Sequence, residues 1–247
     1  MQTFIFVLMN LLIIGSGARE HAFAWKIHNS KKDVKIFATN PNAGMLDIVI
    51  ALNIDISNFK SVKESVVQHS ITLVLVGPEI PLISGITDFL TNHKDLFNVK
   101  VIGPSQLGAK LEGSKEFAKN FMKKYDIPTG LYRSFTKDTL NEGISFIKNS
   151  NPPYVLKADG PAAGKGVIIV NNVKDAVSNL EDMLINSKFG SSSQTVVIEE
   201  FLDGIEMSCF VLFDGLNYKI LPYAKDYKRI GEGDSGLNTG GMGSVSP

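Results

Sequence analysis

A stretch rich in glycine and alanine, Lys157-Ala-Asp-Gly-Pro-Ala-Ala-Gly-Lys-Gly166, indicates the fold class of this chain most clearly. Apolar runs typical of strands precede it at 154–158 and follow it at 167–170. Glycines let backbone N–H groups approach phosphate oxygens, and a lysine at each end of the loop neutralises their charge. The stretch is not a P-loop, because its spacing is one residue short and Gly166 replaces the Ser or Thr that would hold magnesium. We therefore expect a nucleotide-binding loop between two strands, with a solvated hairpin turn as the alternative.

Composition excludes several classes of protein. The 247 residues include 25 basic and 25 acidic side chains, so the net charge is zero and neither nucleic acid nor a membrane surface is an expected partner. The single Cys209 lies in an apolar run and is expected to be a buried thiol. A lone cysteine cannot form an intramolecular disulfide, which favours a reducing, cytoplasmic compartment.

The apolar N-terminus could be mistaken for a targeting segment. No Lys or Arg precedes the apolar run of residues 1–14, as a signal peptide would require, and the run is too short for a membrane span. Residues 10–14 are therefore interpreted as a buried first strand, which makes Met9 an alternative start.

Residues 9–105 are expected to form one Rossmann-like domain. Strand and helix patterns alternate there, because strands are predicted at 11–14, 34–38, 47–52, 73–76 and 99–102 and helices at 18–28, 59–69 and 82–92. This alternation predicts an α/β fold with a parallel, doubly wound sheet.

The pattern changes after this domain. A helical connection is expected over 106–130, with a break near 112–114. Residues 131–198 are predicted to form a small α+β unit with strands near 132–135, 154–158, 167–170 and 195–198, and helices at 139–149 and 173–187. A third region, 199–247, begins with antiparallel strand patterns at 206–213 and 216–222. It ends beside a glycine-rich stretch that needs flanking elements, so we expect the gene product to be longer.

Gly15-Ser-Gly17-Ala-Arg-Glu20 follows the first strand and opens a helix, which predicts a phosphate site at the helix N-terminus. The stretch resembles a dinucleotide fingerprint, but Glu20 replaces its third glycine. Thr39-Asn40-Pro41 stands where an acidic residue would hold a ribose. A Rossmann oxidoreductase is therefore disfavoured, while a smaller phosphorylated ligand remains possible.

Four further segments carry polar groups. Glu79, after the strand at 73–76, could accept sugar hydroxyls or an amine, or be an exposed turn carboxylate. Backbone groups of 199–206 could read an adenine while Glu206 takes ribose hydroxyls, or the segment could be an ordinary acidic turn. The DYKR run at 226–229 and the NTGGMG run at 238–243 supply charge and a second backbone cradle for anions.

These motifs, in this order, resemble those of the phosphoribosylamine–glycine ligases of the ATP-grasp superfamily. The resemblance covers residues 9–247 and rests on GSGAREHA, GPEIPL, LEGSKEFAKNFM, KADGPAAGKG, EEFLDGIEMS, DYKR and NTGGMG. It implies a Rossmann-like domain, an ATP-grasp lid subdomain and the start of a larger subdomain. It also implies ATP-dependent joining of glycine to 5-phosphoribosylamine through glycyl phosphate, with Mg²⁺ or Mn²⁺, in de novo purine synthesis. The implied partners are these small molecules alone, and the full-length enzyme would be a monomer.

The resemblance also assigns site residues by matching motif. ATP would be contacted by Lys115, Lys157, Gly160, Gly164, Lys165, Gly166, Glu199, Glu200, Phe201, Leu202 and Glu206. Phosphoribosylamine would be held by Gly15, Gly17, Arg19, Glu20 and Glu79. The reacting groups would face Asp226, Lys228, Arg229, Asn238, Gly240 and Gly241.

The resemblance places the metal ligands outside this chain. The family's magnesium ligands are a Glu and an Asn of a later strand, and they are expected beyond Pro247. No metal ligand is therefore assigned within the 247 residues, and an incomplete active site is expected.

Two other readings remain. The chain could be a non-catalytic fragment that holds a nucleotide or a phosphoribosyl ligand, which a downstream reading frame encoding the Glu/Asn strand would argue against. It could instead be another ATP-grasp carboxylate–amine ligase, such as a carboxylase subunit, which the GSGAREHA and NTGGMG pair argues against. We also expect the apolar strands of the third region to be uncovered and to promote aggregation.

Overall fold

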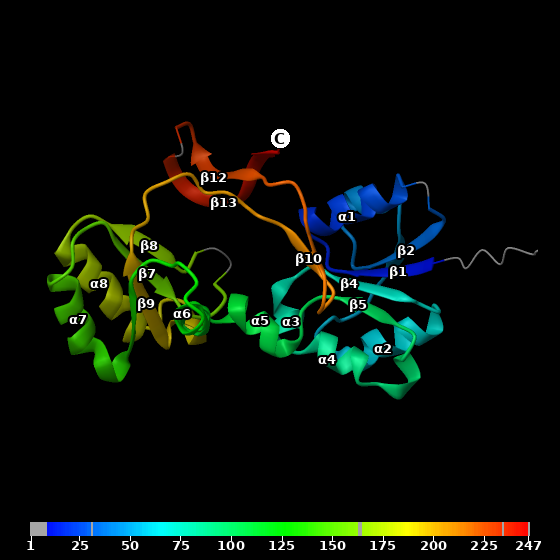
Figure 1. Cartoon of the computed structure of the whole chain (residues 1–247), viewed down its shortest axis with the longest axis horizontal. Helices are drawn as coiled ribbons and strands as arrows, with labels where there is room; N and C mark the ends of the chain where they lie inside the picture. Colours follow the sequence, from blue (N-terminus) through cyan, green and yellow to red (C-terminus); the bar gives the residue numbers. More distant parts are fainter. Residues whose placement is uncertain (1–8, 31, 163–164, 234, 247) are drawn as a thin grey trace, which may run out of the picture. The chain divides into compact units, whose positions relative to one another are not determined.

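The computed structural model describes residues 9–30, 32–162, 165–233 and 235–246, in two compact units that divide between Gly113 and Ser114 (Figure 1). Within the described residues, no helix is both long and apolar enough to cross a bilayer. The finer division into 9–105, 106–130, 131–198 and 199–247 stays a prediction.

Unit 1, up to Gly113, is built on a parallel five-stranded sheet with the order β3-β2-β1-β4-β5. The strands are β1 (Met9–Ile14), β2 (Val34–Thr39), β3 (Ile50–Leu52), β4 (Leu73–Val76) and β5 (Lys100–Ile102). The helices are α1 (Ala18–His28), α2 (Phe59–Gln68), α3 (Glu79–Ile83), α4 (Ile86–Thr91) and α5 (Gln106–Gly113), with short 3₁₀ turns at η1 (Ala43–Met45) and η2 (Lys94–Leu96).

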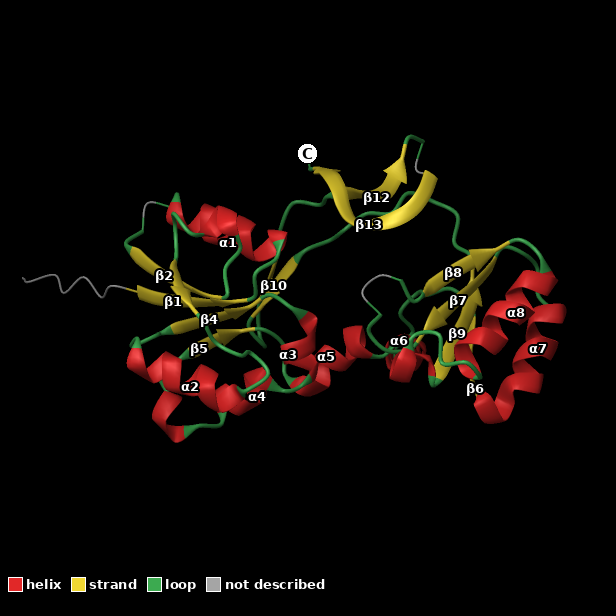
Figure 2. Ribbon diagram, turned by 180° about the vertical axis from the view of Figure 1, so that it is seen from behind, coloured by secondary structure: helices red, strands yellow, loops and turns green. Residues whose placement is uncertain are grey.

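Helices cover both faces of this sheet because the side chains of its strands alternate. Leu11 and Ile13 of β1 pack with Ala24 of α1 in one buried cluster. Leu12 and Ile14 belong to a second cluster, which includes residues of α2 and α4. Figures 1 and 2 show α1 on one side of the strands and α2 and α4 on the other. The predicted doubly wound parallel sheet is confirmed.

Two element boundaries in unit 1 differ from the prediction. The single helix expected at 82–92 is wrong, because Gly85 adopts a φ of 92° and divides the segment into α3 and α4. Since α3 begins at Glu79, that residue opens a helix and does not lie in a turn. The strand expected at 47–52 is confined to Ile50–Leu52, because a 3₁₀ turn and its continuation occupy the preceding residues.

Unit 2, from Ser114 onward, contains an antiparallel four-stranded sheet with the order β6-β9-β7-β8. The strands are β6 (Tyr132–Thr136), β7 (Tyr154–Ala158), β8 (Val167–Val170) and β9 (Thr195–Glu200). The helices are α6 (Lys115–Lys124), α7 (Leu140–Lys148) and α8 (Val173–Leu184), and 3₁₀ turns lie at η3 (Lys137–Thr139) and η4 (Gly190–Ser193). The prediction of two strands flanking the 157–166 loop is confirmed, since β7 and β8 pair directly.

The helices α7 and α8 cover one face of this sheet (Figure 2). Leu156 of β7 and Ile198 of β9 lie directly opposite each other and are buried with Leu180 of α8. Lys157 and Glu199 alternate with these residues, so their side chains belong to the other face. The sheet therefore presents charged groups on the face away from its core.

Two separate hairpins end the described chain, β10 (Val211–Phe213) with β11 (Tyr218–Ile220), and β12 (Lys225–Gly231) with β13 (Ser235–Val245). The strands predicted at 206–213 and 216–222 are therefore shorter than expected. The glycine-rich 238–243 stretch, expected as a backbone cradle for anions, lies in β13, where it pairs with β12 through an irregular register.

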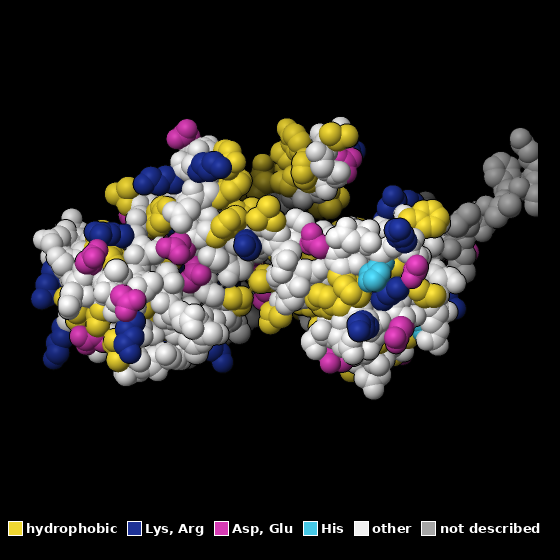
Figure 3. Space-filling view, turned by 90° about the horizontal axis from the view of Figure 1, so that it is seen from below, with side chains coloured by type: hydrophobic (Ala, Val, Ile, Leu, Met, Phe, Trp, Pro, Cys, Tyr) yellow, Lys and Arg dark blue, Asp and Glu magenta, His cyan; other side chains and the backbone are white. Residues whose placement is uncertain are grey.

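Cys209 is exposed, so the expectation of a buried thiol is wrong. Its neighbours in β10 and β11 are exposed as well, including Phe213 at 69% and Leu216, in the turn, at 91%. An apolar run predicts a buried strand only when another element covers it. On the face that Figure 3 shows, hydrophobic side chains also reach the surface, and basic and acidic side chains are interspersed among them.

Candidate functional site

A buried carboxylate in unit 2 is shared by two lysines. The side chain of Glu199, in β9, is only 5% exposed and forms ion pairs with Lys157 of β7 and Lys119 of α6. Lys157 itself is 31% exposed at its side chain, so it can reach both this carboxylate and the surface of the sheet. The arrangement holds Lys157 at the start of the loop that follows β7.

The lysines of this cluster outnumber the carboxylate that they share. Burial lowers the pKa of Lys157, and the charges of Lys119 and Lys115 lower it further, against the opposing effect of Glu206. Burial also lowers the pKa of Lys119, which the charge of Glu200 opposes. An anion placed beside Lys157 would be stabilised by these neighbouring ammonium groups.

Lys115 is anchored to the same loop through the N-terminus of α6. The Asp159 carboxylate accepts hydrogen bonds from the backbone N–H of Glu116 (2.7 Å) and the hydroxyl of Ser114 (3.0 Å). The Lys115 ammonium donates to the backbone oxygens of Asp159 (3.3 Å) and Gly160 (3.5 Å). These bonds place a second lysine beside the start of the glycine-rich loop.

The described part of the loop approaches its neighbours closely where glycine occurs. Gly160 faces Ser192, whose backbone would lie 3.1 Å from an added Cβ, and its N–H donates to the Ser192 oxygen (3.2 Å). Gly166 is buried against Ala158 and Ala162. Lys165 is exposed, while Gly164 lies outside the described residues.

The segment after β9 is open to solvent at the positions expected to meet an adenine. Phe201 is 40% exposed and Leu202 66%, whereas Glu200 is held by reciprocal hydrogen bonds with the backbone of Leu131. Glu206 forms an ion pair of 2.6 Å with Lys228 of β12, and its charge also acts on Lys157. Glu206 therefore connects the segment after β9 to the β12–β13 hairpin.

Lys228 lies between two carboxylates. It pairs with Glu206 and, at 3.3 Å, with Asp226. The hydrogen bond to Glu206 raises the pKa of Lys228, an effect that burial opposes and Asp226 reinforces. Burial would raise the pKa of Asp226, but the hydrogen bond and charge of Lys228, with a hydrogen bond from Ser208, bring it below the usual value.

The remaining residues predicted to face the reacting groups lie on the same hairpin. Arg229 pairs in register with Asn238, and Gly240 and Gly241 follow in β13. Gly241 has a φ of 135°, a conformation that favours glycine. The hydroxyl of Thr239 donates to the Lys228 carbonyl at 2.8 Å, which ties the two strands at this point. The Asn238 side chain lies outside the described part of the chain.

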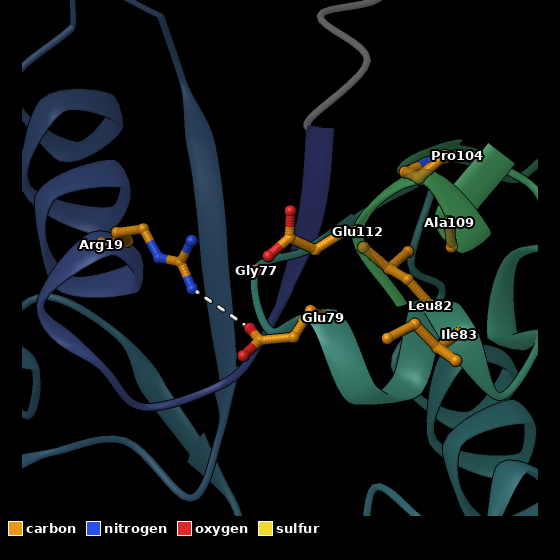
Figure 4. Close-up of a pocket in the computed structure, with 8 residues that line it drawn as sticks. All are labelled: Arg19, Gly77, Glu79, Leu82, Ile83, Pro104, Ala109 and Glu112. Carbon is orange, nitrogen blue, oxygen red and sulfur yellow. Dashed lines mark hydrogen bonds and ion pairs between the residues drawn. The ribbon is translucent and has the colours of Figure 1, made fainter. Parts of the chain in front are cut away.

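Unit 1 contains a pocket of about 370 Å³ at the carboxyl ends of its strands. Arg19, at the start of α1, forms an ion pair with Glu79 at 3.4 Å, and Glu112 of α5 lines the same pocket (Figure 4). Figure 4 shows the apolar side chains of Leu82 and Ile83 farther from Arg19 than the two carboxylates are. The pocket thus combines one cation, two anions and an apolar wall.

Three glycines of unit 1 are fitted around Glu20, which is 4% exposed. Its Oε2 atom accepts a hydrogen bond of 2.6 Å from the N–H of Gly17, the residue that precedes the first turn of α1. An added Cβ at Gly15, Gly17 or Gly77 would meet the Glu20 side chain. Glu20 and Gly17 therefore shape the N-terminus of α1, beside the pocket.

The described residues hold no group of side chains that fits a divalent metal. Nowhere in the described ranges do three His, Cys, Asp or Glu side chains gather closely enough to hold an ion. Two of the carboxylates, Glu199 and Asp226, are paired with lysines. The expectation of metal ligands beyond Pro247 stays a prediction.

Several residues of these sites were not predicted from the sequence. They are Lys119, Asp159 and Ser192 in unit 2, and Leu82, Ile83, Pro104, Ala109 and Glu112 in unit 1. A signal for Lys119 did exist, because it follows Lys115 by one helical turn and so lies on the same face of α6. The contact of Ser192 with Gly160 joins distant parts of the chain and has no local signature.

Comparison with known proteins identifies families for both units. Residues 113–247 match the family model described as phosphoribosylglycinamide synthetase, ATP-grasp (A) domain, and residues 9–112 match the N domain of the same synthetase. A phosphoribosylamine–glycine ligase from Haemophilus influenzae is 42% identical over 241 residues, which are 97% of this chain and 55% of that protein. The chain thus spans about half the length of the curated relatives it matches.

Solved structures show a similar fold. The crystal structure of a phosphoribosylamine–glycine ligase from Thermotoga maritima matches with a TM-score of 0.77 and 34% identity, covering 96% of this chain and 55% of that one. N5-carboxyaminoimidazole synthetase from Staphylococcus aureus, complexed with ADP, matches in fold alone, with a TM-score of 0.64, 14% identity and coverage of 91% and 56%. The expected fold class is confirmed, namely a Rossmann-like sheet followed by an ATP-grasp unit.

Proposed function

The chain belongs to the phosphoribosylglycinamide synthetase family, and on that premise we propose that it supplies the ATP-binding and phosphoribosylamine-binding parts of a ligase for glycine and 5-phosphoribosylamine. The whole reaction is part of the proposal, because the chain spans 55% of the Haemophilus influenzae ligase. A cytoplasmic, monomeric enzyme of purine synthesis that uses only small-molecule partners is the corresponding cellular role.

The observation that carries the proposal is the cluster of Lys157, Lys115 and Glu199 beside the glycine-rich loop. Two lysines reach the start of a loop whose glycines allow close approach of the backbone. Ammonium groups next to such a loop suit a polyphosphate. Phe201 and Leu202, which are partly exposed on the segment after β9, would then receive the adenine, with Glu200 in the same segment and Glu206 near the ribose.

The pocket of unit 1 would hold phosphoribosylamine. The phosphate of this ligand would lie beside Gly15 and Gly17 near the N-terminus of α1, where Arg19 adds a positive charge and Glu20 already accepts the Gly17 N–H. Glu79 and Glu112 offer carboxylate oxygens for ribose hydroxyls or for the amine. Glu20, which is buried and bound to Gly17, shapes this end of the helix rather than contacting the ligand.

The reaction would proceed in two steps. A glycine carboxylate oxygen attacks the γ-phosphorus of ATP, so that glycyl phosphate forms and ADP leaves. The amine nitrogen of phosphoribosylamine then attacks the acyl carbon, phosphate leaves, and the nitrogen loses a proton. In such phosphoryl transfers the protein mainly positions reactants and stabilises charge. Lys157, Lys115 and Lys165 would neutralise phosphate oxygens, while Lys228, Arg229 and residues of β13 would face the reacting groups.

A chimera tests the proposal in a complete protein. In the Haemophilus influenzae ligase, the matched 55% would be replaced by this chain, and ADP release would be measured with and without glycine and phosphoribosylamine. We expect ADP release that requires both substrates, and loss of this activity in the same chimera carrying Lys157→Met. A chimera that binds ATP without turnover would favour the alternative, a non-catalytic nucleotide-binding part. A chimera that folds without binding ATP would contradict the proposal.

A further inference from the structure

We propose that Lys119 is a positioning residue that neutralises the buried carboxylate of Glu199 and thereby leaves Lys157 available for a phosphate group of the nucleotide. This inference rests on the proposed ATP binding, because it describes how Lys157 is kept available in that site. Lys119 lies within the LEGSKEFAKNFM motif, but the sequence assigned no role to it; it follows Lys115 by one helical turn on α6.

The position of Lys119 suits a structural cation rather than a ligand-contacting one. Its residue is 9% exposed, and its ammonium donates to the hydroxyl of Thr129 (2.9 Å) and the backbone oxygen of Gly130 (3.3 Å). The ammonium also lies 5.6 Å from the centre of the Tyr132 ring. With these partners and Glu199 around it, Lys119 has little freedom to turn toward a bound molecule.

Lys157 is placed differently, although it contacts the same carboxylate. Its side chain is about three times as exposed as that of Lys119, at 31% against 11%. The two lysines pair with different oxygens of Glu199, Lys119 with Oε2 and Lys157 with Oε1. When Lys157 turns toward a phosphate, Glu199 would therefore still have a cationic partner in Lys119.

The free-energy cost of leaving Glu199 without a cationic partner explains why a second lysine is needed. A buried carboxylate without a partner is strongly destabilising, so a Glu199 with Lys157 as its sole partner would hold that lysine back. The charge of Lys119 also lowers the pKa of Lys157, after the larger effect of burial, as expected for two ammonium groups that pair with one carboxylate. Lys119 thus weakens the hold of Glu199 on Lys157 by charge repulsion and by sharing the carboxylate.

The first experiment needs no nucleotide. The acylation rate of the Lys157 amine, measured by mass spectrometry on the full chain, reports its neutral fraction. In Lys119→Met we expect this rate to fall about tenfold, the effect of raising the pKa by one unit. In Lys119→Met/Glu199→Gln the rate should return to the wild-type value or exceed it. An unchanged or faster rate in the single variant would overturn the inference.

The second experiment measures equilibrium binding of ATP to the same proteins. Lys119→Met should bind ATP at least about tenfold more weakly than the wild type, the effect of a free-energy change near one pKa unit. Removing the competing carboxylate in the double variant should recover part of that loss, although Glu199 is itself an expected ATP contact. A merely structural role for Lys119 would not be rescued by a second substitution in the same buried cluster, so equal weakness of both variants would overturn the inference.

Lys123→Met provides the matched control, because Lys123 is exposed and lies one helical turn after Lys119 on α6. It should change neither the acylation rate nor ATP affinity. If the wild-type chain binds no ATP at all, the proposed function and the role of Lys119 in ATP binding are both overturned. The acylation experiment would still show whether Lys119, Glu199 and Lys157 are coupled, so the two failures are distinguishable.

Discussion

A side chain at Gly77 would have to occupy space that the carboxylate of Glu20 already fills. Glu20 cannot easily move away, because it is buried and its Oε2 atom accepts the hydrogen bond from Gly17 that closes the N-terminus of α1. The turn after β4 and the turn after β1 are therefore fitted to each other through one carboxylate. This contact supports the end of the sheet where the pocket of unit 1 lies.

Gly77→Ala should destabilise unit 1 by about 1–3 kcal/mol, the usual cost of forcing an extra group into a packed site. The measurement is urea denaturation followed by the fluorescence of Trp25, the single tryptophan of the chain, which lies in α1. Gly204→Ala is the control, since no atom lies within 4 Å of an added Cβ there. Equal unfolding midpoints for the two variants would show that Glu20 yields freely.

The pKa of Asp226 should rise when its cationic partner is removed. In Lys228→Met only burial and weaker hydrogen bonds remain, so the pKa should move from below 3.8 to near or above that value. A ¹³C NMR titration of the aspartate carboxyl groups measures this change. Asp214 is the control, because hydrogen bonds from Asn217 and Leu216 lower its pKa and Lys228 has no part in it.

The sign of the linked stability follows from the direction of that shift. Because the folded pKa of Asp226 lies below the unfolded value, the folded state is stabilised above pH 3.8 and loses this stabilisation as pH falls through the folded pKa. The contribution should stay below about 1 kcal/mol, since the Lys228 side chain is 46% exposed and solvent screens the pair. An Asp226 pKa that does not respond to Lys228→Met would refute the assigned cause.

The β10–β11 hairpin should make the 247-residue chain associate with itself at high concentration. Every residue of both strands is exposed, and a two-stranded hairpin has no second layer to cover its apolar side chains. Sedimentation velocity over a range of concentrations should show association that Phe213→Lys reduces. Phe97→Lys, which removes an exposed phenylalanine (77%) of unit 1, should have little effect. Association unchanged by Phe213→Lys would exclude the hairpin as its cause.

The regular parts of the fold could be predicted because their signals are local. The boundaries of β7, β8 and α1 follow directly from apolar alternation, helical spacing and the glycines that flank them. Gly85 was harder to interpret, since a glycine within a helical pattern does not reveal a positive φ. The pairing of β12 with β13 was hidden, because its glycines are more typical of a loop.

The site was predictable only where a motif is continuous in sequence. Lys157 and Gly160 could be found because they flank one loop. The ion pair between Lys119 and Glu199 could not be found, since it joins a helix to a strand far along the chain. The prediction that Cys209 is buried was wrong for a related reason. Burial depends on the elements that pack against a strand and not on the strand itself.

The central claim is that Lys157 binds a phosphate group of ATP, and equilibrium binding of ATP to the full chain tests it most directly. Isothermal titration calorimetry should show binding by the wild type and a loss of about 1.5–3 kcal/mol in Lys157→Met, the range for a hydrogen bond to a charged group. Lys174→Met, at an exposed position of α8, should bind as the wild type does. Equal ATP affinity in Lys157→Met and the wild type would contradict the account.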